Sequence, residues 1–120
     1  MTEIIGVGID LVDVARFASF LERRPRMLTR LLRDNEQLAL RPERLAARFA
    51  AKEAVMKALG CGLGSVAFRD IEIVSEASGA PQVRLHATAL VRASALGVNR
   101  WHLSLTHTEH SAGAVVIATA

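Results

Sequence analysis

The chain of 120 residues is poor in the residue types on which several protein classes depend. Its one cysteine, Cys61, allows no internal disulfide and suits a reducing compartment. It has no tyrosine and a single tryptophan, so few aromatic side chains are present on which nucleic-acid bases could stack. No apolar run reaches about 18 residues and no signal-peptide pattern opens the chain. We therefore expect a cytoplasmic protein with no membrane segment.

Length and charge narrow the classes further. The length predicts one domain, residues 1–120, with a substantial core. Between Arg16 and Arg48, nine arginines and only four acidic residues give a formal charge of about +5. Such a surface suits phosphates or an acidic protein. It also suits nucleic acid, so a basic nucleic-acid-binding module without catalysis is the alternative function, although no nucleic-acid motif is present.

The longest regular pattern runs from Leu45 to Gly64 and predicts a helix followed by a glycine-rich loop. Apolar residues at helical spacing mark one face of this helix: Leu45, Phe49, Met56 and Leu59. Glu53 and Lys57 are four residues apart and lie on the same side. Most pairs of this kind are solvated surface pairs. Here the alanines at 46, 50 and 54 let another backbone or a ligand come close to both charges.

Three glycines follow this helix. Gly60 lies where a residue in the left-handed conformation commonly ends a helix. Gly62 and Gly64 keep the loop free of side chains, which leaves backbone amides open to an anion. Cys61 lies among them, and because no sequence feature activates it as a nucleophile, we expect a passive loop residue.

The N-terminal segment predicts a buried strand. Ile4 to Asp10 is β-branched and apolar, and it ends on an aspartate, a place that suits a metal ligand or a helix cap. Asp13 is the better cap, for a first helix from Val14 to Arg23. Asp10 is then left without a capping role, and on local grounds a metal-ligand role and a structural role are equally favoured.

The rest of the chain alternates turns, helices and strands. Residues 27–32 predict a short helical turn, residues 34–36 a cap leading into a further helix, and Pro42 the first turn of the central helix. A hairpin is predicted over 70–75 and 82–85, a helix over 86–96, and a second strand pair over 101–106 and 112–118. We expect an α/β chain of the α+β type, with a small antiparallel sheet packed around the long central helix.

The polar turn between the last two strands, residues 106–111, carries two histidines, two threonines and a glutamate. The spacing H-T-E-H does not match the helical zinc motifs, which disfavours a zinc site. We expect His107 and Thr108 instead to donate hydrogen bonds to an anionic ligand.

Three segments carry a family resemblance. They are G-V-G-I-D-L-V-D-V-A-R-F from Gly6, R-F-A-A-K-E-A-V-M-K-A-L-G from Arg48, and H-L-S-L-T-H-T from His102. Through them the chain closely resembles, over essentially its whole length, the holo-acyl-carrier-protein synthases, the small group of the 4′-phosphopantetheinyl transferase superfamily. The resemblance implies that fold. It also implies transfer of 4′-phosphopantetheine from coenzyme A to a serine of apo acyl carrier protein, with release of adenosine 3′,5′-bisphosphate, in support of fatty acid biosynthesis.

The resemblance implies a catalytic centre of three residues. Asp10 and Glu53 match the carboxylates that hold Mg²⁺ against the pyrophosphate, and Lys57 matches a lysine that reaches the phosphates. Mg²⁺ prefers oxygen ligands, so paired carboxylates suit it. Either Glu53 or a metal-bound water held by Asp10 takes the proton of the attacking serine, and both alternatives stay open.

Coenzyme contacts are implied for a second set of residues. Arg48 and His107 match residues that contact the nucleotide's phosphates. Gly60, Gly62 and Gly64 match the loop that lines the coenzyme, although Cys61 replaces an expected threonine. The stretch between Arg24 and Arg41 is shorter than is usual in the family.

The resemblance further implies a homotrimer with active sites at the subunit boundaries. In that assembly one chain supplies Asp10, Glu53 and Lys57, and its neighbour supplies Arg48 and His107. The apolar closing strand, residues 112–118, gives mild independent support, although such a strand is equally well placed at the centre of its own sheet.

The acidic carrier protein needs a positive surface near the metal. Arg16, on the first helix just after Asp10, matches a family arginine that contacts the carrier. A secondary patch is expected from three further arginines: Arg23, Arg24 and Arg26. The alternative for any one of them is a solubilising surface residue.

Overall fold

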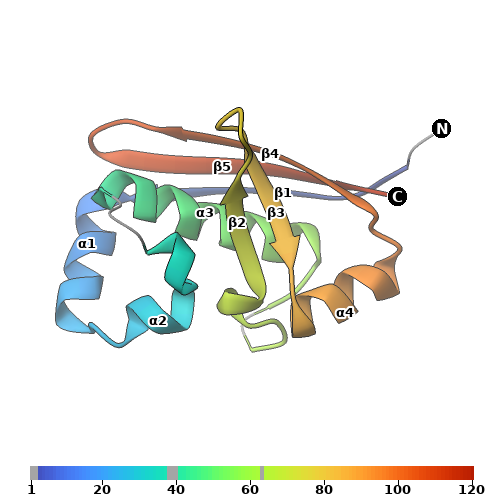
Figure 1. Ribbon diagram of the computed structural model, residues 1–120, viewed down its shortest axis with the longest axis horizontal. Helices are drawn as coiled ribbons and strands as arrows, with labels where there is room; N and C mark the ends of the chain where they lie inside the picture. The colour runs from blue at the N-terminus through green and yellow to red at the C-terminus, as the bar shows by residue number, and fades with distance from the viewer. Residues whose placement is uncertain (1–2, 38–40, 63) are drawn as a thin grey trace.

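One long helix lies on a three-stranded antiparallel sheet in the computed structural model, which describes residues 3–37, 41–62 and 64–120 (Figure 1). The strand order is β1–β5–β4, with β1 at Ile4–Asp13, β5 at Ser111–Thr119 and β4 at Arg100–His107. The helix is α3, Pro42–Ala58, and it packs against all three strands. The expected α+β class and the central position of this helix are confirmed.

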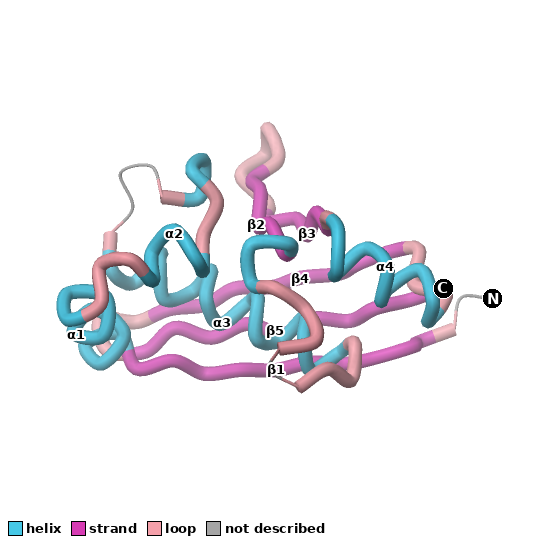
Figure 2. Tube along the Cα trace, turned by 90° about the horizontal axis from the view of Figure 1, so that it is seen from below, coloured by secondary structure: helices cyan, strands magenta, loops and turns pink. Residues whose placement is uncertain are grey.

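The remaining elements surround α3 on the same side of the sheet. Helices α1 (Val14–Arg23) and α2 (Met27–Leu31) lie at one end, and α4 (Ala87–Leu96) lies at the other (Figure 2). Strands β2 (Ile71–Ser75) and β3 (Pro81–Leu85) form a separate two-stranded sheet. Two short 3₁₀ helices, η1 (Asp34–Glu36) and η2 (Phe68–Asp70), complete the described elements. Among the described residues, no helix is long and apolar enough to span a membrane.

Strand β1 is longer than the sequence predicts. We expected it to end at Asp10, which is wrong, because pairing with β5 continues as far as Asp13 opposite Ser111. Asp10 therefore lies inside the strand, opposite Ala114. The predicted cap is confirmed, since the Asp13 carboxylate accepts a hydrogen bond from the Arg16 backbone N–H at 2.8 Å.

Two glycines bring β1 into direct contact with α3. A Cβ added at Gly6 would lie 1.9 Å from the Ala58 carbonyl oxygen, and one added at Gly8 would lie 1.8 Å from that of Ala54. No side chain fits between these backbones. We expected the small residues of α3 to admit either another backbone or a ligand, and the structure places the backbone of β1 there. These small residues are more deeply buried than Leu45 and Phe49 of the predicted apolar face.

Residues 34–36, predicted as a helix cap, form a short helix of their own. They form η1, and the Glu36 side chain is fully buried against α3. Its carboxylate accepts hydrogen bonds from the Lys52 ammonium at 2.8 Å and from the Ile73 backbone N–H at 3.1 Å. Lys52 also donates to the backbone carbonyls of Phe68 and Ile71, so its charge is paired and hydrogen-bonded in the core. Any helix expected over residues 38–40 lies outside the described residues.

Several other boundaries agree with the sequence. Gly60 adopts φ +67° after α3, and Gly97 adopts φ +79° after α4, as left-handed helix ends require. Pro42 occupies the first turn of α3. On β4 the alternating apolar side chains pack against the core: Trp101, Leu103 and Leu105.

Candidate active site

Asp10 and Lys57 meet where β1 crosses α3. The Lys57 ammonium donates hydrogen bonds to the Asp10 carboxylate at 3.1 Å and to the Ile9 backbone carbonyl at 2.9 Å. The Asp10 side chain is largely buried, whereas more than half of the Lys57 side chain is exposed. Side chains two residues apart lie on the same face of a strand, so Asp10 faces α3 as Gly6 and Gly8 do. The close contact of these glycines with α3 therefore fixes where Asp10 meets Lys57.

Glu53 lies one turn before Lys57 on α3, and its environment favours the protonated form. The pKa of the Glu53 carboxyl is raised from its ordinary 4.5 to about 7, first by burial and then by the neighbouring Asp10 carboxylate, while Lys57 acts to lower it. Two carboxyl groups that share a half-buried position repel each other when both are ionised. A bound cation would relieve that repulsion.

These carboxyl groups fit Mg²⁺ better than a transition metal. Mg²⁺ is commonly held by one or two carboxylates, with phosphate oxygens and water completing its shell. Asp10 and Glu53 supply that number. Within the described residues, no group of three or more His, Cys, Asp or Glu side chains gathers as a metal site. His110 and Glu109, in the last turn, are strongly exposed and 4.0 Å apart.

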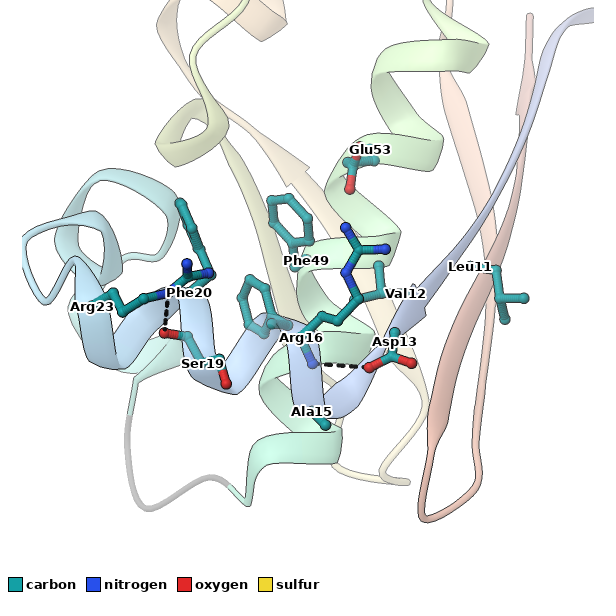
Figure 3. Close-up of a pocket in the computed structure, with 11 residues that line it drawn as sticks. Leu11, Val12, Asp13, Ala15, Arg16, Ser19, Phe20, Arg23, Phe49 and Glu53 are labelled. Carbon is teal, nitrogen blue, oxygen red and sulfur yellow. Dashed lines mark hydrogen bonds between the residues drawn. The ribbon is translucent and has the colours of Figure 1, made fainter.

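Beside Glu53 lies a groove of about 660 Å³, which we call the α1 groove. Helix α1 forms one wall with Arg16, Ser19, Phe20 and Arg23; Leu11, Val12, Asp13, Phe49 and Glu53 line it as well. In Figure 3, Arg16 extends from α1 toward Glu53, and Arg23 lies at the far end near Phe20. The groove therefore joins an acidic corner to a basic and apolar wall.

A second hollow of about 390 Å³ lies between α3, β4 and the β2–β3 hairpin, and we call it the Arg48 cleft. Its basic lining residues are Arg44, Arg48 and His107, and its hairpin side is formed by Ile73, Ser75, Gly79 and Pro81. Arg48 is half-buried, and its Nε is buried without a hydrogen-bond partner among the described residues. An unpaired buried donor of a charged group is costly unless a ligand satisfies it.

The predicted coenzyme residues and the predicted metal ligands lie in different hollows. Arg48 and His107 come together in the Arg48 cleft, whereas Glu53, predicted to hold the metal, lines the α1 groove. On α3, Arg48 and Glu53 are five residues apart, which sets their side chains about 140° apart around the helix axis. A single copy of the chain therefore does not bring these two sets of residues to one point.

The remaining predicted residues take more varied places. Gly62 and Gly64 have open space on their Cβ side, and Gly64 adopts φ +96°, so the loop after α3 exposes its backbone. The Thr108 hydroxyl oxygen accepts from the backbone N–H groups of His110 and Ser111, at 3.2 and 3.0 Å, and closes the β4–β5 turn. Its contact with a ligand stays a prediction.

The two outer arginines lie apart from the α1 groove. Arg24 and Arg26 are exposed between α1 and α2 and do not line it, whereas Arg16 and Arg23 do. The glycines that seat β1 on α3, Gly6 and Gly8, were not singled out from the sequence. Their two-residue spacing ahead of Asp10 is the signal that could have identified them.

The face of the sheet turned away from α3 is apolar and exposed. On β1 it carries Val7, Ile9 and Leu11, which are 57, 67 and 73% exposed, and on β5 it carries Val115. In Figure 1 the sheet runs along the upper edge, with the helices below it, so no helix or strand among the described residues covers this outer face. Contiguous exposed apolar surface of this kind marks interaction sites.

Comparison with known proteins places this arrangement in a class. The model of the 4′-phosphopantetheinyl transferase superfamily matches residues 6–119. The chain therefore belongs to the 4′-phosphopantetheinyl transferase superfamily.

Individual relatives narrow the class to one enzyme. The chain is 49% identical over 115 residues to the holo-[acyl-carrier-protein] synthase of Frankia casuarinae, covering 96% of this chain and 97% of that one. It is likewise 49% identical over 120 residues to the synthase of the same name from Streptomyces coelicolor, with coverage of 96% and 97%.

Solved structures agree on the fold. The holo-[acyl-carrier-protein] synthase of Helicobacter pylori in complex with coenzyme A superposes with a TM-score of 0.84 at 30% identity, covering 93% of this chain and 98% of that one. The Plasmodium yoelii acyl carrier protein synthase with ADP bound gives a TM-score of 0.90 at 28% identity, covering 100% and 98%. The expected fold and family are confirmed, and nothing in these comparisons favours the nucleic-acid-binding alternative.

Proposed function

We propose that this chain transfers the 4′-phosphopantetheine group of coenzyme A to a serine of apo acyl carrier protein and so supports fatty acid biosynthesis in the cytoplasm. The observation that carries the proposal is the meeting of Asp10, Glu53 and Lys57 at the crossing of β1 and α3. Two carboxylates and an ammonium, of which Glu53 lines an open groove, are the groups that phosphoryl transfer requires, because that reaction depends on positioning and electrostatics.

The transfer makes one phosphorus–oxygen bond and breaks another. The serine oxygen bonds to the phosphorus that carries pantetheine, the bond from that phosphorus to the leaving diphosphate oxygen breaks, and adenosine 3′,5′-bisphosphate departs with the electron pair. The serine proton passes to a base near Glu53 and Asp10. Lys57 uses two of its three N–H groups on Asp10 and Ile9, which leaves the third for a phosphate oxygen.

Asp10 and Glu53 would hold Mg²⁺ in this site. The metal supplies Lewis-acid polarisation of the phosphate under attack and offsets charge on the leaving group. The raised pKa of Glu53 supports this assignment, because it reflects a half-buried carboxyl group beside a second acid, whose combined charge Lys57 offsets only in part.

The coenzyme would extend from this centre into the Arg48 cleft of a neighbouring chain. Arg48 and His107 would bind the phosphates of the nucleotide there, and the glycine loop after α3 would lie along the coenzyme. The separation of the two hollows in one chain supports a site shared between copies. The exposed outer face of the sheet offers the apolar surface for a homotrimer.

The carrier protein would dock along the α1 groove. Arg16 and Arg23 give its α1 wall a positive charge that complements an acidic partner, and Glu53 at its edge marks where the serine must arrive. Arg24 and Arg26 would extend the positive surface beyond the groove.

A mass spectrum of the carrier protein tests the proposed function. Incubation of the chain with apo acyl carrier protein, coenzyme A and Mg²⁺ should add one phosphopantetheine group, and EDTA should prevent the addition reversibly. An unmodified carrier in the presence of folded enzyme would contradict the proposal. Retention of DNA or RNA in moderate salt would instead support the nucleic-acid-binding alternative.

A further inference from the structure

Arg44 lines the Arg48 cleft but has no role in the function proposed so far. It lies in the first turn of α3, where the helix dipole disfavours a cation. Arg48 follows four residues later, so two like charges lie on the same side of the helix. Arg44 is exposed, and within the described parts of the chain it makes no ion pair and no side-chain hydrogen bond, so its guanidinium is accessible to a ligand in the cleft.

The lining of the cleft leaves these positive charges unbalanced. The residues that line it include two arginines and one histidine but no Asp or Glu. Burial lowers the pKa of Arg48, the Glu36 carboxylate raises it, and the charge of Arg44 lowers it again. The nearby Glu36 is already bonded to Lys52 in the core. A hollow that is lined by two arginines and by no acidic residue suits a ligand that carries negative charge.

The ligand that suits this charge is a phosphate monoester. A monoester carries close to two negative charges at neutral pH and three acceptor oxygens, whereas a diester phosphate carries one charge. Arginine side chains bind such groups through two parallel hydrogen bonds. Coenzyme A has a single monoester, the phosphate on its ribose, in addition to its diphosphate.

We infer that Arg44 is a specificity-determining residue that selects coenzyme A over analogues lacking the ribose 3′-phosphate. The inference rests on the proposed function for the identity of the nucleotide. It goes beyond that function because it assigns a role to Arg44, which neither the catalytic centre nor the contacts of Arg48 and His107 require.

The test compares two nucleotides that differ by one phosphate. Calorimetric titration of the protein with coenzyme A and with 3′-dephospho-coenzyme A, in the absence of carrier protein, measures the contribution of the ribose phosphate without catalysis. For Arg44→Ala we expect coenzyme A binding to weaken about tenfold and dephospho-coenzyme A binding to change by less than about twofold. Arg44→Lys keeps the charge without the planar fork, so its affinity for coenzyme A should lie between those of the wild type and Arg44→Ala.

Arg41→Ala is the matched control, because Arg41 is exposed three residues earlier and does not line the cleft. It should bind both nucleotides like the wild type. Equal weakening of both nucleotides by Arg44→Ala, or no change in either, would overturn the inference. The outcome is separable from the proposed function: an enzyme that transfers phosphopantetheine with no dependence on Arg44 refutes this inference only, whereas Arg44-dependent nucleotide binding without transfer refutes the proposed function only.

Discussion

The two long sides of α3 differ in charge and in what they face. One side carries Glu53 and Lys57 and turns toward β1 and the α1 groove. The other carries Arg44 and Arg48 and turns toward the β2–β3 hairpin. The carboxylate proposed to bind the metal thus lies on one side of the helix, and two arginines without an acidic partner in their cleft lie on the other. Because the two sets of side chains point in different directions, each set can contribute to a different active site. This difference underlies the proposed active site that is shared between two chains.

The largest expected effect comes from removing a carboxylate on the Glu53 side. Asp10→Ala and Glu53→Ala should each lower the transfer rate by at least about 100-fold, because each removes charge that holds the metal at the reacting phosphate. Glu53→Gln is the sharper variant, since it keeps the shape and removes only the charge. The measurement is the rate of carrier modification at saturating coenzyme A. Near-normal activity of Glu53→Gln at ordinary Mg²⁺ concentration would reduce Glu53 to a helix surface group.

The next largest effect is expected on the oligomeric state, from a charge placed on the exposed outer face of the sheet. Val7→Glu places a charge in the middle of this apolar face and should convert the proposed trimer to monomers, with activity falling in parallel. Leu90→Glu, on the exposed side of α4 and away from the sheet, is the matched control and should leave both unchanged. Sedimentation velocity measures the assembly. A wild-type protein that sediments as a monomer at working concentration would contradict the trimer.

A moderate effect is expected on the α1 groove. Arg16→Glu should raise the KM for carrier protein roughly tenfold and make it less sensitive to added salt, while the KM for coenzyme A stays within about twofold. Arg100→Glu, an exposed position on β4 outside both hollows, serves as the control. Steady-state kinetics at two salt concentrations give the answer. Equal changes in both KM values would mean that Arg16 supports the fold or the coenzyme site.

The smallest effect is on the stability of the metal-free protein. Glu53 has its pKa raised to about 7 in the folded chain, so its contribution to stability is fully present below pH 4.5 and is lost as pH rises through 7. Glu53→Gln removes that loss and should raise the melting temperature at pH 8 but not at pH 4.5. Thermal unfolding in EDTA at both pH values measures it. A melting temperature at pH 8 equal to or below that of the wild type would contradict the raised pKa.

Sequence patterns predict most of the local structure of this chain. The cap at Asp13, the left-handed glycine at 60 and the central helix follow from short-range rules, and the structure confirms them. The length of β1 was predicted wrongly, because pairing with β5 decides it and that pairing joins residues about a hundred positions apart. The ion pair of Glu36 with Lys52 was missed for the same reason, since a buried charge pair depends on tertiary packing.

The candidate site divides in the same way. Asp10, Glu53 and Lys57 were named from the sequence with the help of a family resemblance, and the structure brings them together. The separation of Arg48 from Glu53 into two hollows follows from the turn of α3 and the packing around it. No motif contains that packing, so only the structure could reveal Arg44 as a member of the Arg48 cleft.

The most direct measurement is complementation between two inactive variants. Asp10→Ala lacks one half-site and Arg48→Ala lacks the other, and each alone should transfer phosphopantetheine poorly. If active sites form between subunits, mixed trimers from a 1:1 refolded mixture should recover up to about a quarter of wild-type activity, because random assembly unites two intact halves at that share of boundaries. Native mass spectrometry verifies that the chains have mixed. Mixed trimers with no more activity than the two variants alone would contradict a site shared by the two sides of α3.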